Sequence, residues 1–554
     1  MADQDFLWGP RFDEYSQRKF DPFAFSTARA TYEESMSWLK TYGILPLNAM
    51  IATLQDSDPR VDRDKLVQER DLQVDYQTIY KYAEQQKHRI FERYYGFVAF
   101  RRLLHSISLA ILEETDSMGK FIFALPSHAS WGEMSQLAAF MALEIVAQEP
   151  HKGSDTQARN HILSLPILEM TPDMPNESSL QILISLWTSR ARLITLCLRG
   201  YFPGCAILLR LLYFRLAPEV SHDTAASLFL QDIASRLYLV GSHRDRQILA
   251  PICMLPVEKD IHWPTGATRF ANAEDSAIIV NAYSGLLLVW RQDSSRIESL
   301  SVEFMCHLIE FTLHVTVHNP ASKLPEALDA ISWGLRTMWL LFEHYGRIPL
   351  RAHSDTRRLA IYCFGVLKLI EKQFVKKQGD RQLFAQMLAA NEFLGLITRV
   401  ILLVTDEGNE FKDTGGQHYL AEKLEELEDT VNLSVIAAPE VFVDSSIEWF
   451  KVLRHLWAWV EMWTDNKEEQ DLMGECALQP WGHYGKSINQ IFETRPQGCA
   501  NPRCFEQLTH EGSLRFRLIC GGCKRAAYCD IKCQQAHWQL ATVDSHKRSC
   551  IKQV

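Results

Sequence analysis

The chain has 554 residues, of which 23% are charged and 47% are hydrophobic. A chain of this length can bury a large core, and its ordinary composition excludes wholesale disorder and collagen-like structure. The formal net charge is −10. It is unevenly spread, because the residues from Arg495 onward carry a surplus of six positive charges and the rest a surplus of sixteen negative ones. An acidic body argues against nucleic-acid binding, which depends on clustered positive charge.

The beginning of the chain, residues 1–5, lacks the positive and apolar regions of a signal peptide. The strongest apolar stretch, residues 394–404, contains Arg399 and is shorter than the roughly 18 residues that a membrane helix needs. We therefore expect a soluble protein without membrane contact, located in the cytoplasm, the nucleus or both.

Helical periodicity runs through residues 1–465. One segment begins with a capping box at Ser178–Gln181 and stops at Gly200, a second has Pro325 near its start, and a third runs from Ser354 to about Lys377. Similar patterns cover residues 27–42, 74–115, 131–147, 204–216, 222–240, 270–291, 300–318, 382–404, 417–430 and 440–464. Alternating strand patterns are scarce, so the sequence predicts a mainly α protein.

Helices of this length joined by short turns are similar to those of armadillo or HEAT arrays, in which helical pairs stack. No fixed sequence period is present, so a compact irregular bundle is the alternative. We predict a helical body at residues 1–465 and a linker at 466–498, which contains a charged run and Pro480.

The body lacks the familiar catalytic motifs. It contains no phosphate-binding loop, no dinucleotide-binding glycine pattern, no nucleophile elbow and no His-Glu-x-x-His motif. Its cysteines at 197, 205, 253, 306 and 363 stand among apolar residues, which is typical of buried structural thiols. We therefore do not expect an enzyme.

Seven of the 13 cysteines lie in the last 56 residues. Together with one histidine they form four pairs: Cys499 and Cys504, Cys520 and Cys523, Cys529 and Cys533, His546 and Cys550. Zinc takes four nitrogen or sulfur ligands, so eight ligands predict two closed structural zinc sites within residues 499–550. Gly521 and Gly522 permit a tight turn that directs two sulfurs at one ion. His537, four residues after Cys533, is the alternative histidine ligand.

This pattern resembles the MYND-type zinc finger in the order of its ligands, in Tyr528 before Cys529, and in Gln534 and Trp538 after Cys533. The first pair departs from the family, because four residues rather than two separate its cysteines. The resemblance implies interleaved ion binding, and it favours His546 over His537. One ion would be held by Cys499, Cys504, Cys529 and Cys533, and the other by Cys520, Cys523, His546 and Cys550.

The resemblance also implies binding of proline-containing peptides of partner proteins, through Gln534 and Trp538. Alternatively, Trp538 only packs against the zinc knuckles. We expect an interaction adaptor or scaffold. Similar architectures include regulators of transcription and ubiquitin-ligase adaptors, and a SET-type lysine methyltransferase is a weaker alternative, because its cofactor motif is missing here. DNA binding by the finger is weaker still, since seven thiolates and two zinc ions reduce its surplus to about +3.

Overall fold

The computed structural model describes most of the helical body and parts of the C-terminal region. The described residues are 8–16, 37, 41, 44–56, 69–126, 129–148, 176–220, 224–255, 271–292, 302–317, 319, 323–345, 351–405, 422–442, 449, 452–453, 456, 481–482, 484, 518–522, 526–528, 531–539 and 546–550. The contacts divide the chain into two compact units, Met1–Ser322 and Lys323–Val554. The predicted boundaries at 465 and 498 stay predictions.

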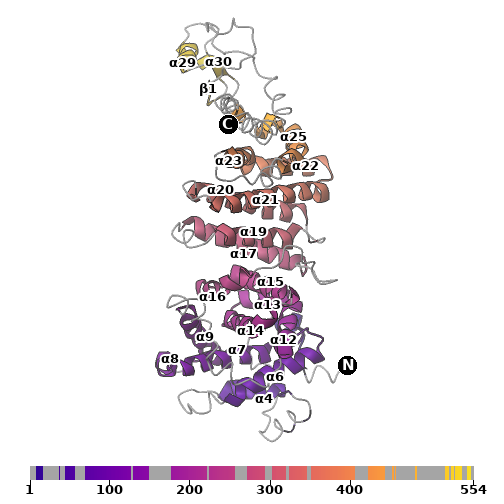
Figure 1. Cartoon of the computed structure of the whole chain (residues 1–554), viewed down its shortest axis with the longest axis vertical. Coiled ribbons are helices and arrows are strands. Elements are labelled where there is room, and N and C mark those ends of the chain that lie inside the picture. Colours follow the sequence, from indigo (N-terminus) through magenta and orange to yellow (C-terminus); the bar gives the residue numbers. More distant parts are fainter. Residues whose placement is uncertain are drawn as a thin grey trace. The chain divides into compact units, whose positions relative to one another are not determined.

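The described part of the first unit consists of helices. They are α2 (Phe12–Ser16), α4 (Leu47–Asp56), α6 (Glu69–Gln85), α7 (Tyr94–Glu114), α8 (Met118–Ala124), α9 (Trp131–Gln148), α12 (Asn176–Thr188), α13 (Arg190–Leu198), α14 (Cys205–Val220), α15 (Thr224–Val240), α16 (His243–Cys253), α17 (Ala273–Gln292) and α19 (Val302–Val317). Helices close in sequence pack together, as α6 does on α7, α7 on α9, α15 on α16 and α17 on α19 (Figure 1).

The second unit continues with helices and ends in the finger. Its elements are α20 (Leu324–Tyr345), α21 (Arg351–Phe374), α22 (Gln378–Ala390), α23 (Phe393–Thr405), α25 (Glu428–Ala437), η2 (Pro439–Phe442), β1 (Leu518–Ile519), β2 (Ala527–Tyr528), α29 (Ile531–Gln539) and α30 (His546–Ser549). α20 packs on α21, and α22 packs on α25. The predicted mainly α fold is confirmed, while the armadillo- or HEAT-like class stays a prediction.

Three predicted helices are each two helices in the structure. The segment 74–115 is divided between α6 and α7, where Lys87 and His88 have positive φ angles of 50° and 67°. The predicted helix 178–200 is interrupted at Ser189, between α12 and α13. The predicted helix 382–404 is interrupted at Asn391 and Glu392, between α22 and α23, and Glu392 has a positive φ angle of 48°. None of these turns contains proline or glycine, so the sequence lacks the usual stop signals.

The structure also differs from the predicted helices in several short helices and in where some helices begin. The helices α4, α8 and α16 were not predicted, although Ser242 and Asp245 form a capping box that marks the start of α16. Within the predicted helix 417–430, residues 422–426 are helical, a turn lies at Leu427 and α25 begins at Glu428, while residues 417–421 lie outside the described residues. Most of the predicted helices 27–42 and 440–464 lie outside the described residues.

α7 forms the centre of the first unit. Its side chains are buried at nearly every position from Tyr94 to Leu112. The helix is long and apolar enough to cross a membrane, but 94% of its most apolar 18-residue stretch is buried inside the protein. Such burial is expected of a core helix, whose apolar side chains are covered on all sides by other helices.

Buried charges connect three helices of the first unit. Arg236 on α15 is fully buried and forms ion pairs with Asp232, at 3.0 Å, and with Asp275 at the start of α17. Arg190 on α13 lies 3.6 Å from the same Asp232. Burial alone would lower the pKa of Arg236, but the two carboxylates outweigh it and raise the pKa. The network therefore keeps its charges and ties α13, α15 and α17 together.

Candidate functional site

The finger is built on a short hairpin and two helices. β1 and β2 pair antiparallel, with Leu518 opposite Tyr528 and Ile519 opposite Ala527. The backbone N–H of Cys520 donates to the carbonyl of Ala526 at 2.8 Å, so the hairpin directs the Cys520 side chain at a defined position. Residues 521 and 522 form the turn, as the two glycines predicted.

Three potential metal ligands converge beside this hairpin. The Sγ atoms of Cys520 and Cys550 and a ring nitrogen of His546 all lie within 4.8 Å of one another. The two sulfurs are 3.6 Å apart. Tetrahedral zinc with Zn–S bonds of about 2.3 Å places two sulfur ligands about 3.8 Å apart. The donor set and its spacing therefore fit a zinc ion.

The resemblance to the MYND finger implies that Cys523 joins these three residues around one ion. Cys523 lies outside the described residues, and so do three of the four ligands predicted for the other ion, Cys499, Cys504 and Cys529. The remaining ligand of that group, Cys533 on α29, is half-buried and packs against the cluster of Cys520, Ala526 and Tyr528. The number of ions and the complete ligand sets stay predictions.

The structure gives the two candidate histidines different positions. His546 is buried at the start of α30 and belongs to the metal-capable group. Burial, together with neighbouring His537, lowers its pKa, which favours the neutral ring that a metal requires. His537 is buried on α29, and its Nδ1 lies 3.2 Å from the Tyr528 hydroxyl. His537 therefore supports the packing of the finger, a role that its sequence position did not reveal.

The two residues predicted to bind peptides lie on α29. Gln534 and Trp538 are four residues apart and share a helical face. Gln534 is half-buried, whereas Trp538 is 40% exposed. The Trp538 ring also lies 5.9 Å from the ring of His546, measured between centroids. Trp538 thus contacts a candidate zinc ligand on one side and presents apolar surface to solvent on the other.

Comparison with known proteins identifies the C-terminal region. Residues 501–550 match the family model of the MYND finger. Neither the curated proteins nor the solved structures include a match to the chain. The chain therefore carries a MYND finger after a helical region, and this finger is a zinc-binding protein-interaction domain. The matched residues include Cys504 but begin two positions after Cys499, the residue whose spacing departs from the family.

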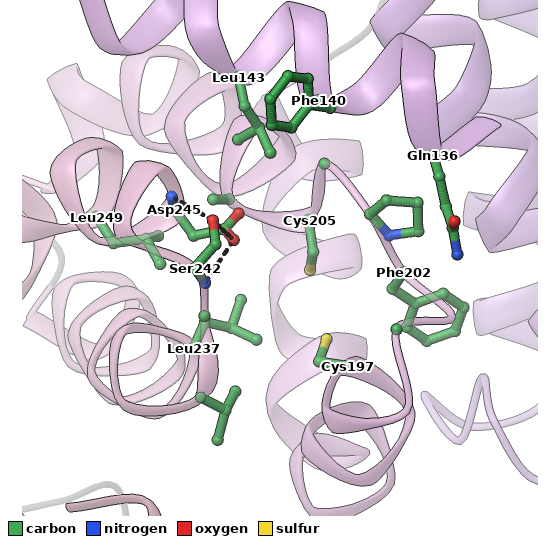
Figure 2. Close-up of a pocket in the computed structure, with 16 residues that line it drawn as sticks. Gln136, Phe140, Leu143, Cys197, Phe202, Cys205, Leu237, Ser242, Asp245 and Leu249 are labelled. Carbon is green, nitrogen blue, oxygen red and sulfur yellow. Dashed lines mark hydrogen bonds between the residues drawn. The ribbon is translucent and has the colours of Figure 1, made fainter. Parts of the chain in front are cut away.

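A second candidate site is a cavity of about 300 Å³ in the first unit. It is lined by α9, by the connection from α13 to α14, and by the ends of α15 and α16. Figure 2 shows the thiols of Cys197 and Cys205 pointing toward one another at its wall. The neighbouring Cys205 and burial raise the pKa of the Cys197 thiol, so it is protonated and a poor nucleophile.

The main polar residues of this cavity, Ser242 and Asp245, are hydrogen-bonded to each other. Asp245 accepts hydrogen bonds from the backbone N–H and the hydroxyl of Ser242, at 2.9 and 2.6 Å. The rest of the wall is largely apolar, with side chains such as Phe140, Leu143 and Phe202 (Figure 2). This arrangement agrees with the interpretation of Cys197 and Cys205 as structural thiols, and it offers no catalytic group among the described residues.

Proposed function

We propose that this protein is an interaction adaptor or scaffold whose finger binds proline-containing segments of partner proteins. The observation that supports the proposal is the exposed face of α29. Ile531 and Trp538 are 58% and 40% exposed, and with Gln534 between them they follow the spacing of one helical face. An aromatic ring beside an amide is suited to a polyproline-type segment, which is stiff and loses little entropy on binding.

The metal centre would have a supporting role. A site closed by cysteine and histidine ligands leaves no position for substrate, so its zinc is structural. The ion at Cys520, His546 and Cys550 would hold the end of β1 and α30 in place, and the second ion would hold α29 through Cys533, so that Trp538 stands beside His546. The finger would then be a rigid platform, and we propose that the chain is not an enzyme. The methyltransferase alternative predicts S-adenosylmethionine binding, which calorimetry on the full chain would reveal.

Peptide binding by the full chain tests the proposal. We expect Trp538→Ala to abolish binding of proline-rich synthetic peptides without loss of zinc, because Trp538 contributes contact surface and no metal ligand. Gln535→Ala, an exposed position next to that face, should bind normally and is the matched control. Peptides with alanine in place of proline should not bind. Equal binding by Trp538→Ala and Gln535→Ala would contradict the proposal.

The helical body in front of the finger suggests a wider role for the protein. We propose that the helical body binds a second partner, so that the protein connects two others; a regulator of transcription or a ubiquitin-ligase adaptor is the role that similar architectures suggest. We also propose a reducing location, the cytoplasm or the nucleus. The described cysteines form no disulfide, which supports this location. Affinity purification with wild-type and Trp538→Ala protein would separate partners of the finger from partners of the body.

A further inference from the structure

A nearly buried arginine of the first unit has no counter-charge among the residues that the structure describes. Arg101 on α7 is 7% exposed and its Nε is buried without a hydrogen-bond partner, and the described residues form no ion pair with it. The adjacent Arg102 is equally buried, but its Nε lies 2.6 Å from the Asp75 carboxylate. Because an isolated buried cation is costly, such a group normally pairs with an anion. The fold supplies this anion to Arg102 and not to Arg101.

Two aromatic rings contact the guanidinium of Arg101. Its Cζ atom lies 4.5 Å from the centroid of the Trp131 ring and 5.5 Å from that of Phe97. Such cation–π contacts stabilise the charge of the guanidinium without supplying an oxygen acceptor for its N–H groups. This fork of donors matches the oxygens of a carboxylate or a phosphate.

Trp131 and His105 complete what we call the Arg101 cluster. The indole N–H of Trp131 and the Nδ1 of His105 are also buried without a hydrogen-bond partner in the described structure, and the two rings lie 5.6 Å apart. Burial and the charges of Arg101 and Arg102 lower the pKa of His105 to about 4, so His105 adds no charge at neutral pH. The Arg101 cluster therefore combines one permanent cation with a second N–H donor.

The cluster lies at the beginning of a long helix. Trp131 is the first residue of the 18-residue helix α9, and a Cβ atom on Gly132 would stand 4.0 Å from Nη2 of Arg101. The positive end of the helix dipole favours an anion at this place. The nearby carboxylate of Glu133 accepts from the backbone N–H and hydroxyl of Ser130, at 2.7 and 2.8 Å, and forms no ion pair with Arg101.

We propose that the Arg101 cluster binds an oxyanion, a carboxylate or a phosphate group, between the Arg101 guanidinium, the Trp131 indole N–H and the first turn of α9. The anion would come from a small molecule or from an acidic side chain of a peptide. This site is separate from the finger and does not depend on zinc.

Thermal unfolding and calorimetric titration of the full chain at pH 7.5 test the proposal. The probes are phosphate, acetate and a tetraglutamate peptide with its tetraglutamine counterpart, each compared with chloride at equal ionic strength. We expect at least one oxyanion to raise the Tm above its value in chloride, and Arg101→Met to remove this rise. Trp131→Phe, which keeps the ring and removes one donor, should weaken binding roughly fivefold.

Arg102→Met is the matched control. In chloride, Arg101→Met should have a Tm equal to or above that of the wild type, because it removes an isolated buried charge, whereas Arg102→Met should have a lower Tm because it leaves Asp75 unpaired. Binding of phosphate or acetate would indicate a small anion, and binding of tetraglutamate alone a peptide. If no probe differs from chloride, or if Arg101→Met keeps the wild-type response, the proposal is wrong. Should Arg101→Met not fold, the titrations of wild type and Trp131→Phe decide.

Discussion

Trp449 and Trp481 exchange two hydrogen bonds between indole and backbone. The indole N–H of Trp449 donates to the carbonyl of Trp481 at 3.0 Å, and the indole N–H of Trp481 donates to the carbonyl of Trp449 at 3.1 Å. Trp481 and Tyr484 are fully buried, and the Tyr484 hydroxyl donates to the carbonyl of Leu424. These two residues lie in the segment predicted as a linker, 466–498, so part of that segment packs into the second unit.

We expect Trp481→Ala to destabilise the second unit by about 3–5 kcal/mol, because a large buried ring and the hydrogen bond donated by its indole N–H are lost. Chemical denaturation checks this value. A chain ending at residue 465 should be less stable than one ending at 490 for the same reason. Phe123→Ala is the control, since this side chain is 93% exposed and its loss should change stability by less than about 0.5 kcal/mol. Equal stability of the two truncated chains would refute the packing of this segment.

Removal of one zinc ligand should affect the finger alone. We expect the purified chain to hold about two zinc ions, and Cys550→Ser to lose at least one of them, because Cys550 belongs to the converging group. Helical circular dichroism of the body should remain nearly unchanged. Cys306→Ser, a buried cysteine of α19, should keep the full zinc content. Elemental analysis measures the ions, and a wild-type protein without zinc would contradict the metal centre.

Gly96 allows the close contact between α7 and the preceding turn. A Cβ atom at this position would stand 1.7 Å from the backbone oxygen of Ile90 and 2.6 Å from the Tyr82 ring. We therefore expect Gly96→Ala to destabilise the first unit by about 3 kcal/mol or more, because the backbone itself must move. Gly285→Ala is the matched control, since nothing lies within 4 Å of its Cβ position inside α17. It should stabilise the chain by roughly 0.5–1 kcal/mol. Thermal unfolding that ranks the two variants equally would contradict this account.

His105 should make the first unit sensitive to acid. Its pKa is about 4 in the folded chain and about 6.5 when unfolded, so the unfolded chain binds more protons between these values. The contribution of neutral His105 is therefore complete above pH 6.5 and is lost as the pH falls toward 4, by about 3 kcal/mol at most. His105→Gln should flatten the dependence of stability on pH in this range. A wild-type slope in the variant would exclude His105 as its source.

Much of the fold and of the metal centre could be predicted because the signals are local. Helical periodicity located most of the helices in the described body, and paired cysteines with glycines between them indicated the turn after Cys520. The helix breaks at residues 87–88, 189 and 391–392 could not be predicted, because they contain no glycine or proline. Polar residues form these turns, and tertiary contacts rather than local sequence stabilise them. For the same reason the burial of Trp481 and Tyr484 was not evident from a segment rich in charge.

The sequence by itself determined that this chain has a helical body and a C-terminal finger with ligands for zinc, because residue type and spacing are enough to specify helices and metal knuckles. The resemblance to the MYND finger favoured His546 as the ligand, and the tertiary structure places it beside Cys520 and Cys550. Only the tertiary structure decided which of two adjacent arginines receives a carboxylate and that His537 packs against Tyr528. His537 and His546 both lie near cysteines in sequence, and Arg101 and Arg102 differ by one position on one helix. Their roles differ because the folded chain places Cys520 and Cys550 beside His546, the Tyr528 hydroxyl beside Nδ1 of His537, and the Asp75 carboxylate beside Arg102.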